Sequence, residues 1–439
     1  MKVLVYTEQP SPRVAYACRV LLECMLGLQA EATNDWASFC AYSGPRLIYG
    51  NAPKPSSLPR LPAAPLLQQE GIQPQGIDIC MHQSLPAAFF LPDVAEALLP
   101  FDLLSFTFYL CTRYEEYLPY TPDEHGRFPA RASLAFQAGF LERPVLQEWA
   151  AVFLEQLRHY YPALPDRRPA YSFRPTYDID MARAYRHRPF PVLLAGAARE
   201  VWNGAVHLLS DRLLTLAGQR PDPFDTFAYL QDRHQRYHHR PLYFLLLGDY
   251  GRYDKNLPAE SPVMRQLITS LGTEGGLGLH PSYRSNGDPA QLSRECQRFS
   301  RLAGYPPQRS RQHFLKLRFP ATYRALIGAG IQEDYTMGFA DAVGFRAGLA
   351  VPYPWYDLEK EAECPLAIYP FQLMDGTLRQ YMKLSPDEAI GKTRQLIDQV
   401  RSAGGYFLPL WHNSSFSAHH GWEGWDRVHE ALLQYGQAD

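Results

Sequence analysis

Apolar and polar positions follow different patterns along the chain, and these patterns predict two α/β segments. In the first segment, short apolar runs bounded by turn residues predict strands, and apolar positions three or four residues apart predict helices. The predicted strands are Val3–Tyr6, Leu47–Tyr49 and Ile77–Cys80, and the predicted helices lie near Val14–Leu26, Leu103–Tyr117 and Val145–Tyr160. The polar segment Pro162–Pro169, which contains three prolines, predicts a domain boundary. We therefore expect a small α/β domain of unknown role over residues 1–164.

The second segment, residues 165–439, has a regular alternation of strands and helices. Its strand candidates are Tyr171–Tyr177, Leu242–Leu247, Gly276–Leu279, Gln312–Leu317, Ile331–Asp334, Val343–Phe345, Leu366–Phe371 and Tyr406–Leu410. One helix has a clear start signal, with Ser385 as N-cap, Pro386 at the first position and Glu388 completing a capping box. About eight parallel strands in roughly 270 residues predict a β/α barrel, in which active sites form at the C-terminal ends of the strands.

Ionisable side chains follow or close several of these predicted strands. They are Asp178, Asp180, His280, Arg311, His313, Arg346 and His412. In an extended backbone Asp178 and Asp180 point to the same side, so their carboxylates repel unless a cation or a proton is shared. A divalent metal resolves this repulsion if one carboxylate ligates it and the other stays free as a base. The alternative is an Asp pair that caps the following helix.

Composition narrows the class of protein. The net charge is −2, which provides no basic field to hold nucleic acid. Aromatic residues reach 13%, and such side chains often line carbohydrate sites, although a Tyr-rich core and surface is the simpler interpretation. The seven cysteines are an odd number without a C-x-x-C motif, which argues against a disulfide framework and a zinc ribbon. No signal-peptide pattern and no membrane-spanning apolar run is found, so we expect a cytoplasmic protein.

Three motifs of the second segment resemble those of a known family. They are TYDID (Thr176–Asp180), GLHPSYRS (Gly278–Ser285) and LPLWHN (Leu408–Asn413). With these motifs in this order, the chain from about Tyr171 to the C-terminus resembles the polysaccharide deacetylase family, which implies a distorted (β/α) barrel. Three further stretches are similar to a bacterial subgroup of unassigned substrate that carries an extra N-terminal α/β domain: RQHFLK (Arg311–Lys316), DYTMGFADAVGFRAG (Asp334–Gly348) and MDGTL (Met374–Leu378).

The resemblance implies a role for each matched residue. Asp178 would be the catalytic base, Asp180 and His280 would bind a divalent metal, expected to be Zn²⁺, and His412 would be the general acid. The metal would polarise the substrate carbonyl and lower the pKa of its water. We expect the removal of an N-acetyl or related acyl group from a carbohydrate. Alternatives are a C–N hydrolase acting on a small amide and a non-catalytic carbohydrate-binding relative.

The chain departs from the family pattern at one ligand. The family's second motif has another histidine four residues after the first, where this chain has Arg284, which cannot ligate a metal. His313 is the best substitute as third ligand, and a core histidine is the alternative. Arg311 and Arg346 either orient the Asp178 carboxylate or bind substrate, or they are buried ion-pair partners without a catalytic role. Loss of the histidine is also the main support for a non-catalytic relative.

Overall fold

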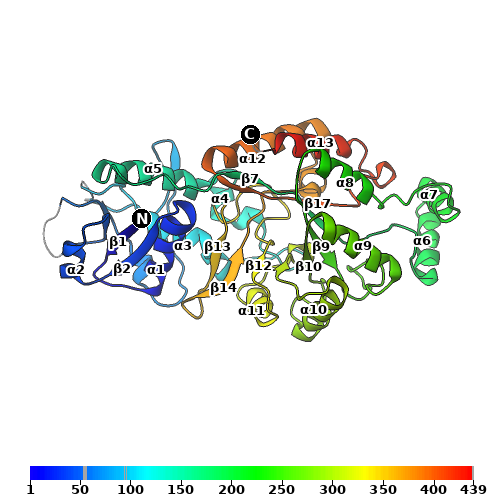
Figure 1. The fold of residues 1–439 in the computed structure, drawn as a ribbon, viewed down its shortest axis with the longest axis horizontal. Helices are drawn as coiled ribbons and strands as arrows, with labels where there is room; N and C mark the ends of the chain where they lie inside the picture. The colour runs from blue at the N-terminus through cyan, green and yellow to red at the C-terminus, as the bar shows by residue number, and fades with distance from the viewer. Residues whose placement is uncertain (53–56, 93, 95, 438–439) are drawn as a thin grey trace.

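The computed structural model describes residues 1–52, 57–92, 94 and 96–437. Its long axis runs from a small N-terminal sheet, in blue, to the helices α6 and α7, in green (Figure 1). A larger sheet with helices around it lies between them. None of the described helices is long and apolar enough to cross a membrane.

The N-terminal part contains a four-stranded parallel sheet in the order β2-β1-β3-β4. Its strands are β1 (Lys2–Tyr6), β2 (Gln29–Thr33), β3 (Arg46–Tyr49) and β4 (Arg60–Leu61), and β5 (Cys80–His82) and β6 (Leu85–Ala87) form a separate hairpin. Its helices are α1 (Pro12–Cys18), which continues as a π-helix over Arg19–Met25, α2 (Trp36–Ala41), α3 (Leu103–Cys111), α4 (Leu134–Gln137) and α5 (Val145–Tyr160). The predicted helix Val145–Tyr160 is confirmed to the residue, whereas the predicted strand Ile77–Cys80 only touches the start of β5.

The larger sheet has nine strands in the order β13-β14-β12-β11-β10-β9-β8-β17-β15. The strands are β8 (Thr176–Ile179), β9 (Leu242–Leu246), β10 (Gly276–His280), β11 (Arg309–Ser310), β12 (Glu333–Asp334), β13 (Tyr353–Asp357), β14 (Ala362–Ile368), β15 (Leu373–Met374) and β17 (Pro409–His412). All neighbours are parallel except β13 and β14. Within the described residues the outer strands β13 and β15 do not pair with each other, but β14, which pairs with β12, and β15, which pairs with β17, are separated by only residues 369–372. The predicted α/β fold with a large parallel sheet is confirmed, whereas the closure of a barrel stays a prediction.

Helices cover this sheet or, in the case of α6 and α7, project beyond it, and a further strand pair lies outside it. The helices are α6 (Phe190–Trp202), α7 (Val206–Leu216), α8 (Phe227–Arg236), α9 (Pro262–Glu274), α10 (Pro289–Ala303), α11 (Ala321–Gly328), α12 (Pro386–Ala403) and α13 (Trp425–Tyr435). The pair consists of β7 (Tyr171–Phe173) and β16 (Gly405–Phe407). The predicted capping box of α12 is confirmed, because Ser385 and Glu388 hydrogen-bond to each other's backbone N–H.

Two predicted strands are wrong. Residues 312–317 form a 3₁₀ turn over His313–Leu315 instead, because Phe314 and Leu315 adopt positive φ angles of 59° and 53°, which a strand excludes. Residues 343–345 are irregular. Gly344 has a φ of 125°, and a Cβ there would lie 2.3 Å from the Leu141 carbonyl oxygen, so the chain needs a glycine at this close approach.

The two parts of the chain are packed against each other through one apolar core. Buried side chains of α1, α3 and α5 belong to the same cluster as those of β13 and β14. The Tyr16 hydroxyl donates to the Pro354 carbonyl over 2.9 Å, and the Arg13 guanidinium pairs with Glu361. The boundary near residue 164 stays a prediction.

Candidate active site

Six of the seven predicted site residues converge at the C-terminal edge of the large sheet. Asp178 lies in β8, and Asp180 follows that strand. His280 and His412 are the last residues of β10 and β17. Arg311 and His313 follow β11. Five of these six side chains, Arg311 being the exception, line a cavity of about 340 Å³.

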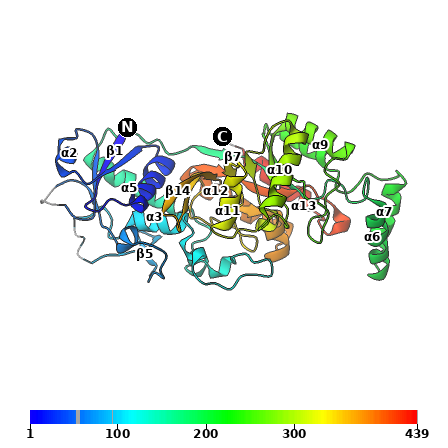
Figure 2. The same cartoon turned by 90° about the horizontal axis from the view of Figure 1, so that it is seen from below.

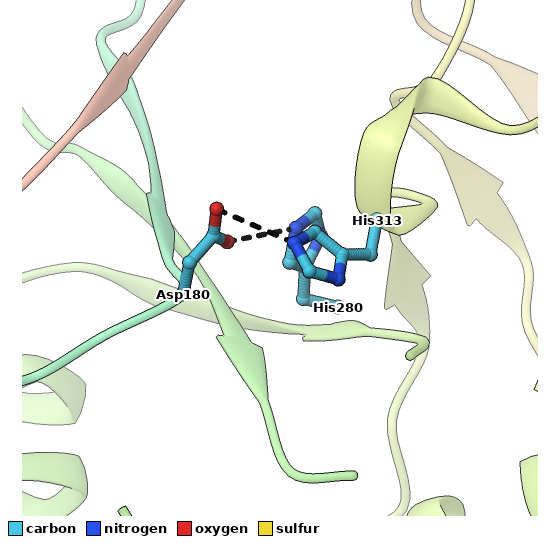
Figure 3. A group of neighbouring side chains, drawn as sticks. All are labelled: Asp180, His280 and His313. Carbon is cyan, nitrogen blue, oxygen red and sulfur yellow. Dashed lines mark ion pairs between the residues drawn. The ribbon is translucent and has the colours of Figure 1, made fainter. Parts of the chain in front are cut away.

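Asp180, His280 and His313 form the tightest group in this cavity (Figure 3). Oδ1 of Asp180 lies 3.1 Å from Nε2 of His280, and Oδ2 lies 3.5 Å from Nε2 of His313. One nitrogen or oxygen from each side chain lies within 4.8 Å of the other two. The three atoms therefore face a common point, as the ligands of a cation do.

Partners behind the two imidazoles fix their orientation. Nδ1 of His280 lies 2.6 Å from the Arg311 carbonyl oxygen, and Nδ1 of His313 lies 2.8 Å from Oδ1 of Asp254. Both partners accept a hydrogen bond, so each Nδ1 carries a proton and donates it. In the neutral imidazole this leaves the Nε2 lone pair free toward Asp180, which is the arrangement that metal-binding histidines use.

The residues present fit a divalent cation. Oδ1 of Asp180 is buried and has no hydrogen-bond partner among the described residues, and an unsatisfied buried oxygen is costly unless a ligand completes it. Burial opposes the ionisation of Asp180, but the neighbouring His313 and His280 hold its pKa well below the usual value. Burial also lowers the pKa of His313, and the carboxylates of Asp180 and Asp254 outweigh it and raise that pKa to about 9.

Asp178 is held by an arginine. Nη1 of Arg311 donates to Oδ1 of Asp178 over 3.0 Å, and Oδ2 lies 3.7 Å from Nε2 of His280. The Arg311 guanidinium is fully buried, with Phe244 and Phe371 on its faces at 4.5 and 5.6 Å. The interpretation that Arg311 orients the Asp178 carboxylate therefore fits the contacts.

His412 lies opposite Asp178 on the neighbouring strand β17. Its Nδ1 lies 2.7 Å from Oδ1 of Asp375, and its backbone N–H donates to Oδ2 of the same carboxylate. Nε2 is thereby turned toward the cavity, 3.7 Å from Oδ2 of Asp180. Burial lowers the pKa of His412, but Asp375 and then Asp180 outweigh it and raise the pKa to about 10. The imidazole is therefore protonated at neutral pH and has a proton to donate.

Three residues that contribute to the site were not predicted. Asp375 lies in the MDGTL stretch directly after β15, and its position at a strand end is the signal that marks it. Asp254 comes from the loop after β9, where no pattern singles it out. Arg127 comes from the N-terminal part and lines the cavity, where it donates to the Phe314 carbonyl oxygen over 2.9 Å.

Arg346 corrects the seventh assignment. Its Nε and Nη2 donate to Glu116 over 2.9 and 2.5 Å, and its Nη1 donates to the Gly338 carbonyl oxygen. It does not line the cavity and has no contact with Asp178. Glu116 also accepts a hydrogen bond from Arg113, and all three side chains are buried. Arg284, in contrast, is exposed to solvent, as its permanent charge leads one to expect.

Comparisons with known proteins add the following. Residues 3–162 match a family of unknown function (DUF7033). No curated protein matches the chain. Solved structures that are similar include a putative polysaccharide deacetylase from Mycobacterium smegmatis (16% identity, TM-score 0.40, 62% of this chain and 85% of that one). A probable polysaccharide deacetylase from Pseudomonas aeruginosa is also similar, with 14% identity and a TM-score of 0.38 over 61% of this chain and 84% of that one. Puue allantoinase has 12% identity and a TM-score of 0.39 over 62% of this chain and 84% of that one.

Proposed function

We propose that the protein is a metal-dependent hydrolase that removes an N-acetyl or related acyl group from an amino sugar. The observation that carries this proposal is the meeting of three ligand-type side chains with a further carboxylate and a further imidazole in one cavity. A pure binding site needs no base and acid beside the ligand group. The position of His313, whose Nε2 lies 3.5 Å from Oδ2 of Asp180, supports this proposal over the non-catalytic alternative.

Asp180, His280 and His313 are the residues that would hold the metal. Two imidazoles and one carboxylate are a ligand set typical of catalytic zinc, which keeps a further position open. A bound divalent cation would supply Lewis acidity, which polarises a carbonyl and lowers the pKa of water. Asp254 would act behind His313, because its carboxylate keeps the Nδ1 proton in place.

Asp178 and His412 would handle the protons of the reaction. Asp178 remains free of the ligand set and would take a proton from the attacking water, while Arg311 fixes its orientation. His412 would donate its Nε2 proton to the leaving amine, so that the C–N bond breaks to a neutral amine. Asp375 would hold the imidazole in the correct orientation and stabilise its charge.

The cavity walls support a sugar as substrate. Trp422 and Phe224 line the cavity and offer flat apolar faces, against which a sugar ring packs well. The volume of about 340 Å³ is near the lower limit of ligand sites, so a small amide is the second candidate. Both candidates require the same chemistry at the C–N bond.

A substrate panel tests this proposal. The zinc-loaded protein is incubated with N-acetylglucosamine, with its short β-1,4 oligomers and with small cyclic and linear amides, and released amine or carboxylate is measured. We expect acetate release from an N-acetyl sugar and none with Asp178→Asn. Hydrolysis of small amides alone would favour the second candidate. No turnover of any amide by a zinc-loaded protein would contradict a hydrolase.

A further inference from the structure

Helices α6 and α7 form a hairpin that projects from the body of the protein. Both views show it at the end of the molecule opposite the N-terminal sheet (Figures 1 and 2). The two helices pack against each other and are joined by a short turn over residues 203–205. A segment that extends from the body in this way buries little of its own surface against the core.

The outward surface of this hairpin is apolar. Trp202 is 90% exposed, Phe190 75% and Val206 72%. Of the fifteen large hydrophobic side chains that are exposed in the described part of the chain, seven lie on these two helices: Phe190, Leu194, Val201, Trp202, Val206, Leu213 and Leu216. Exposed apolar groups gathered in this way mark an interaction surface.

The inside of the hairpin is polar. The buried residues of its two helices are Glu200, Asp211, Arg212 and Thr215. Glu200 accepts two hydrogen bonds from the Arg212 guanidinium, at 2.8 and 2.6 Å, and Arg220 pairs with Asp211. Helices of water-soluble domains normally bury their apolar face and expose the polar one. The reversed arrangement points to apolar surroundings outside the hairpin.

The hairpin and its base are also positively charged. Residues 183–225 contain six arginines against four acidic residues, in a chain whose net charge is −2. Arg199 is exposed on α6, and Arg188 and Lys255 lie at the base, where they line a second cavity together with Arg199. The partner of this surface must therefore bind apolar side chains and carry negative charge.

We propose that the α6–α7 hairpin docks the protein on an anionic lipid surface. A bilayer interface supplies both requirements, because acyl chains accept the apolar side chains and acidic headgroups attract the arginines. Trp202 stands next to the turn, and tryptophan is enriched at the headgroup level of membranes. Helices of 13 and 11 residues are about 20 and 16 Å long, shorter than the ~30 Å hydrocarbon core, so the hairpin lies in the interface.

A second copy of the chain suits this surface less well. Two-fold interfaces bring the same patch of both subunits together. Contact between two hairpins would therefore place two arginine-rich segments against each other, and this repulsion opposes association.

Docking by the hairpin would also place the active site near the lipid. The second cavity, of about 670 Å³, lies between the hairpin and the body of the protein. It shares Met181, Phe224 and His420 with the active-site cavity. The hairpin therefore stands directly beside the entrance to the catalytic residues.

Vesicle co-sedimentation of the full chain tests the proposal. The probes are phosphatidylcholine vesicles with and without about 30% phosphatidylglycerol. We expect binding to the anionic vesicles, with weaker binding at about 0.5 M salt because charges are screened. Trp202→Ser/Val206→Ser should lower the partition coefficient at least tenfold, because two apolar side chains that would be buried in the lipid are lost. Arg199→Glu should also weaken it.

Matched controls are available on exposed sites elsewhere. Met81→Ser removes an apolar side chain that is 66% exposed and lies outside the hairpin, and Arg131→Glu reverses an exposed charge. Neither substitution should change vesicle binding. Absence of wild-type binding to anionic vesicles, or equal binding by the double variant, would overturn the proposal. A dimer in light scattering that the double variant abolishes, without vesicle binding, would assign the surface to a second copy instead.

Discussion

Two clusters of buried charges lie in this molecule, and they differ in how their polar atoms are satisfied. In the cluster of Arg113, Glu115, Glu116 and Arg346, no side-chain nitrogen or oxygen lacks a hydrogen-bond partner among the described residues. In the active-site cluster, Oδ1 of Asp180 and Nη2 of Arg311 lack one. Most side chains of both clusters are buried, so burial alone does not distinguish the two clusters.

The difference separates a structural role from a functional one. The first cluster joins the N-terminal part to the segment after β12, and its arginines and glutamates form ion pairs with one another. The second cluster leaves atoms unpaired at the wall of a cavity, and such atoms need a ligand to offset their desolvation. In the sequence, Arg346 resembles the active-site residues because it is ionisable and closes a predicted strand. Only its partners show the difference.

The largest expected effect is on turnover. Asp178→Asn should lower the rate by about 10²–10⁴-fold, and His412→Ala by about 10²-fold or more, because general acid and base groups typically contribute that much. Both variants should still bind metal, and Asp178→Asn should also lose stability because the buried Arg311 loses its carboxylate partner. Steady-state kinetics on a substrate that the wild type hydrolyses measures this, and wild-type rates for both would refute the assigned roles.

Breaking the other cluster should reduce stability. Arg346→Met removes a positive charge that pairs with the buried Glu116 carboxylate. Removing one partner of a buried ion pair typically lowers the free energy of unfolding by about 3–5 kcal/mol. Arg143→Met is the control, since its pair with Glu148 is partly exposed and should be worth about 1 kcal/mol or less. Urea unfolding gives both values. Equal losses in the two variants would show that the Arg346 cluster does not stabilise the packing.

Substitutions at His313 and at Arg284 should have different effects on metal affinity. His313→Ala removes a proposed ligand and should weaken zinc binding by more than the 10–100-fold that loss of an outer contact causes. Arg284→Ala should leave it unchanged, because that side chain is exposed. Competition with a chromogenic chelator measures both. Wild-type affinity in His313→Ala would assign this histidine a structural role.

The smallest of these effects should come from Arg127. This side chain lines the cavity and contacts the Phe314 carbonyl and the Tyr381 hydroxyl, but it touches none of the proposed ligands. Arg127→Ala should raise KM by about tenfold, or ~1.4 kcal/mol, with metal affinity unchanged. Arg131→Ala, in the same segment but exposed, is the control. An unchanged KM would remove the N-terminal part from substrate binding.

Local sequence signals predicted the parts of the site that depend on strand ends. Asp178 and Asp180 were found from their spacing, and His280 and His412 from short motifs that close their strands. His313 lies near the predicted place although its predicted strand is a 3₁₀ turn, because β11 ends just before it. The roles of these residues stay predictions.

Local sequence patterns could not predict the contacts between segments that are far apart in the chain. Arg346 and Glu116 are 230 residues apart, and no local pattern reports such a pair. The same holds for Asp254 behind His313, and for Arg127, which reaches the cavity from the other part of the chain. Periodicity shows that strands and helices alternate but not how the end strands of the sheet lie, so the closure of a barrel stays a prediction.

The most direct test of the functional assignment is a zinc titration of the metal-stripped protein by calorimetry, together with Asp180→Ala. If the unpaired Asp180 oxygen marks a cation site, the wild type should bind one ion per chain. Asp180→Ala should lose that binding while it remains folded by circular dichroism. A wild-type protein that binds no zinc, or an Asp180→Ala variant that binds it equally well, would contradict the central claim.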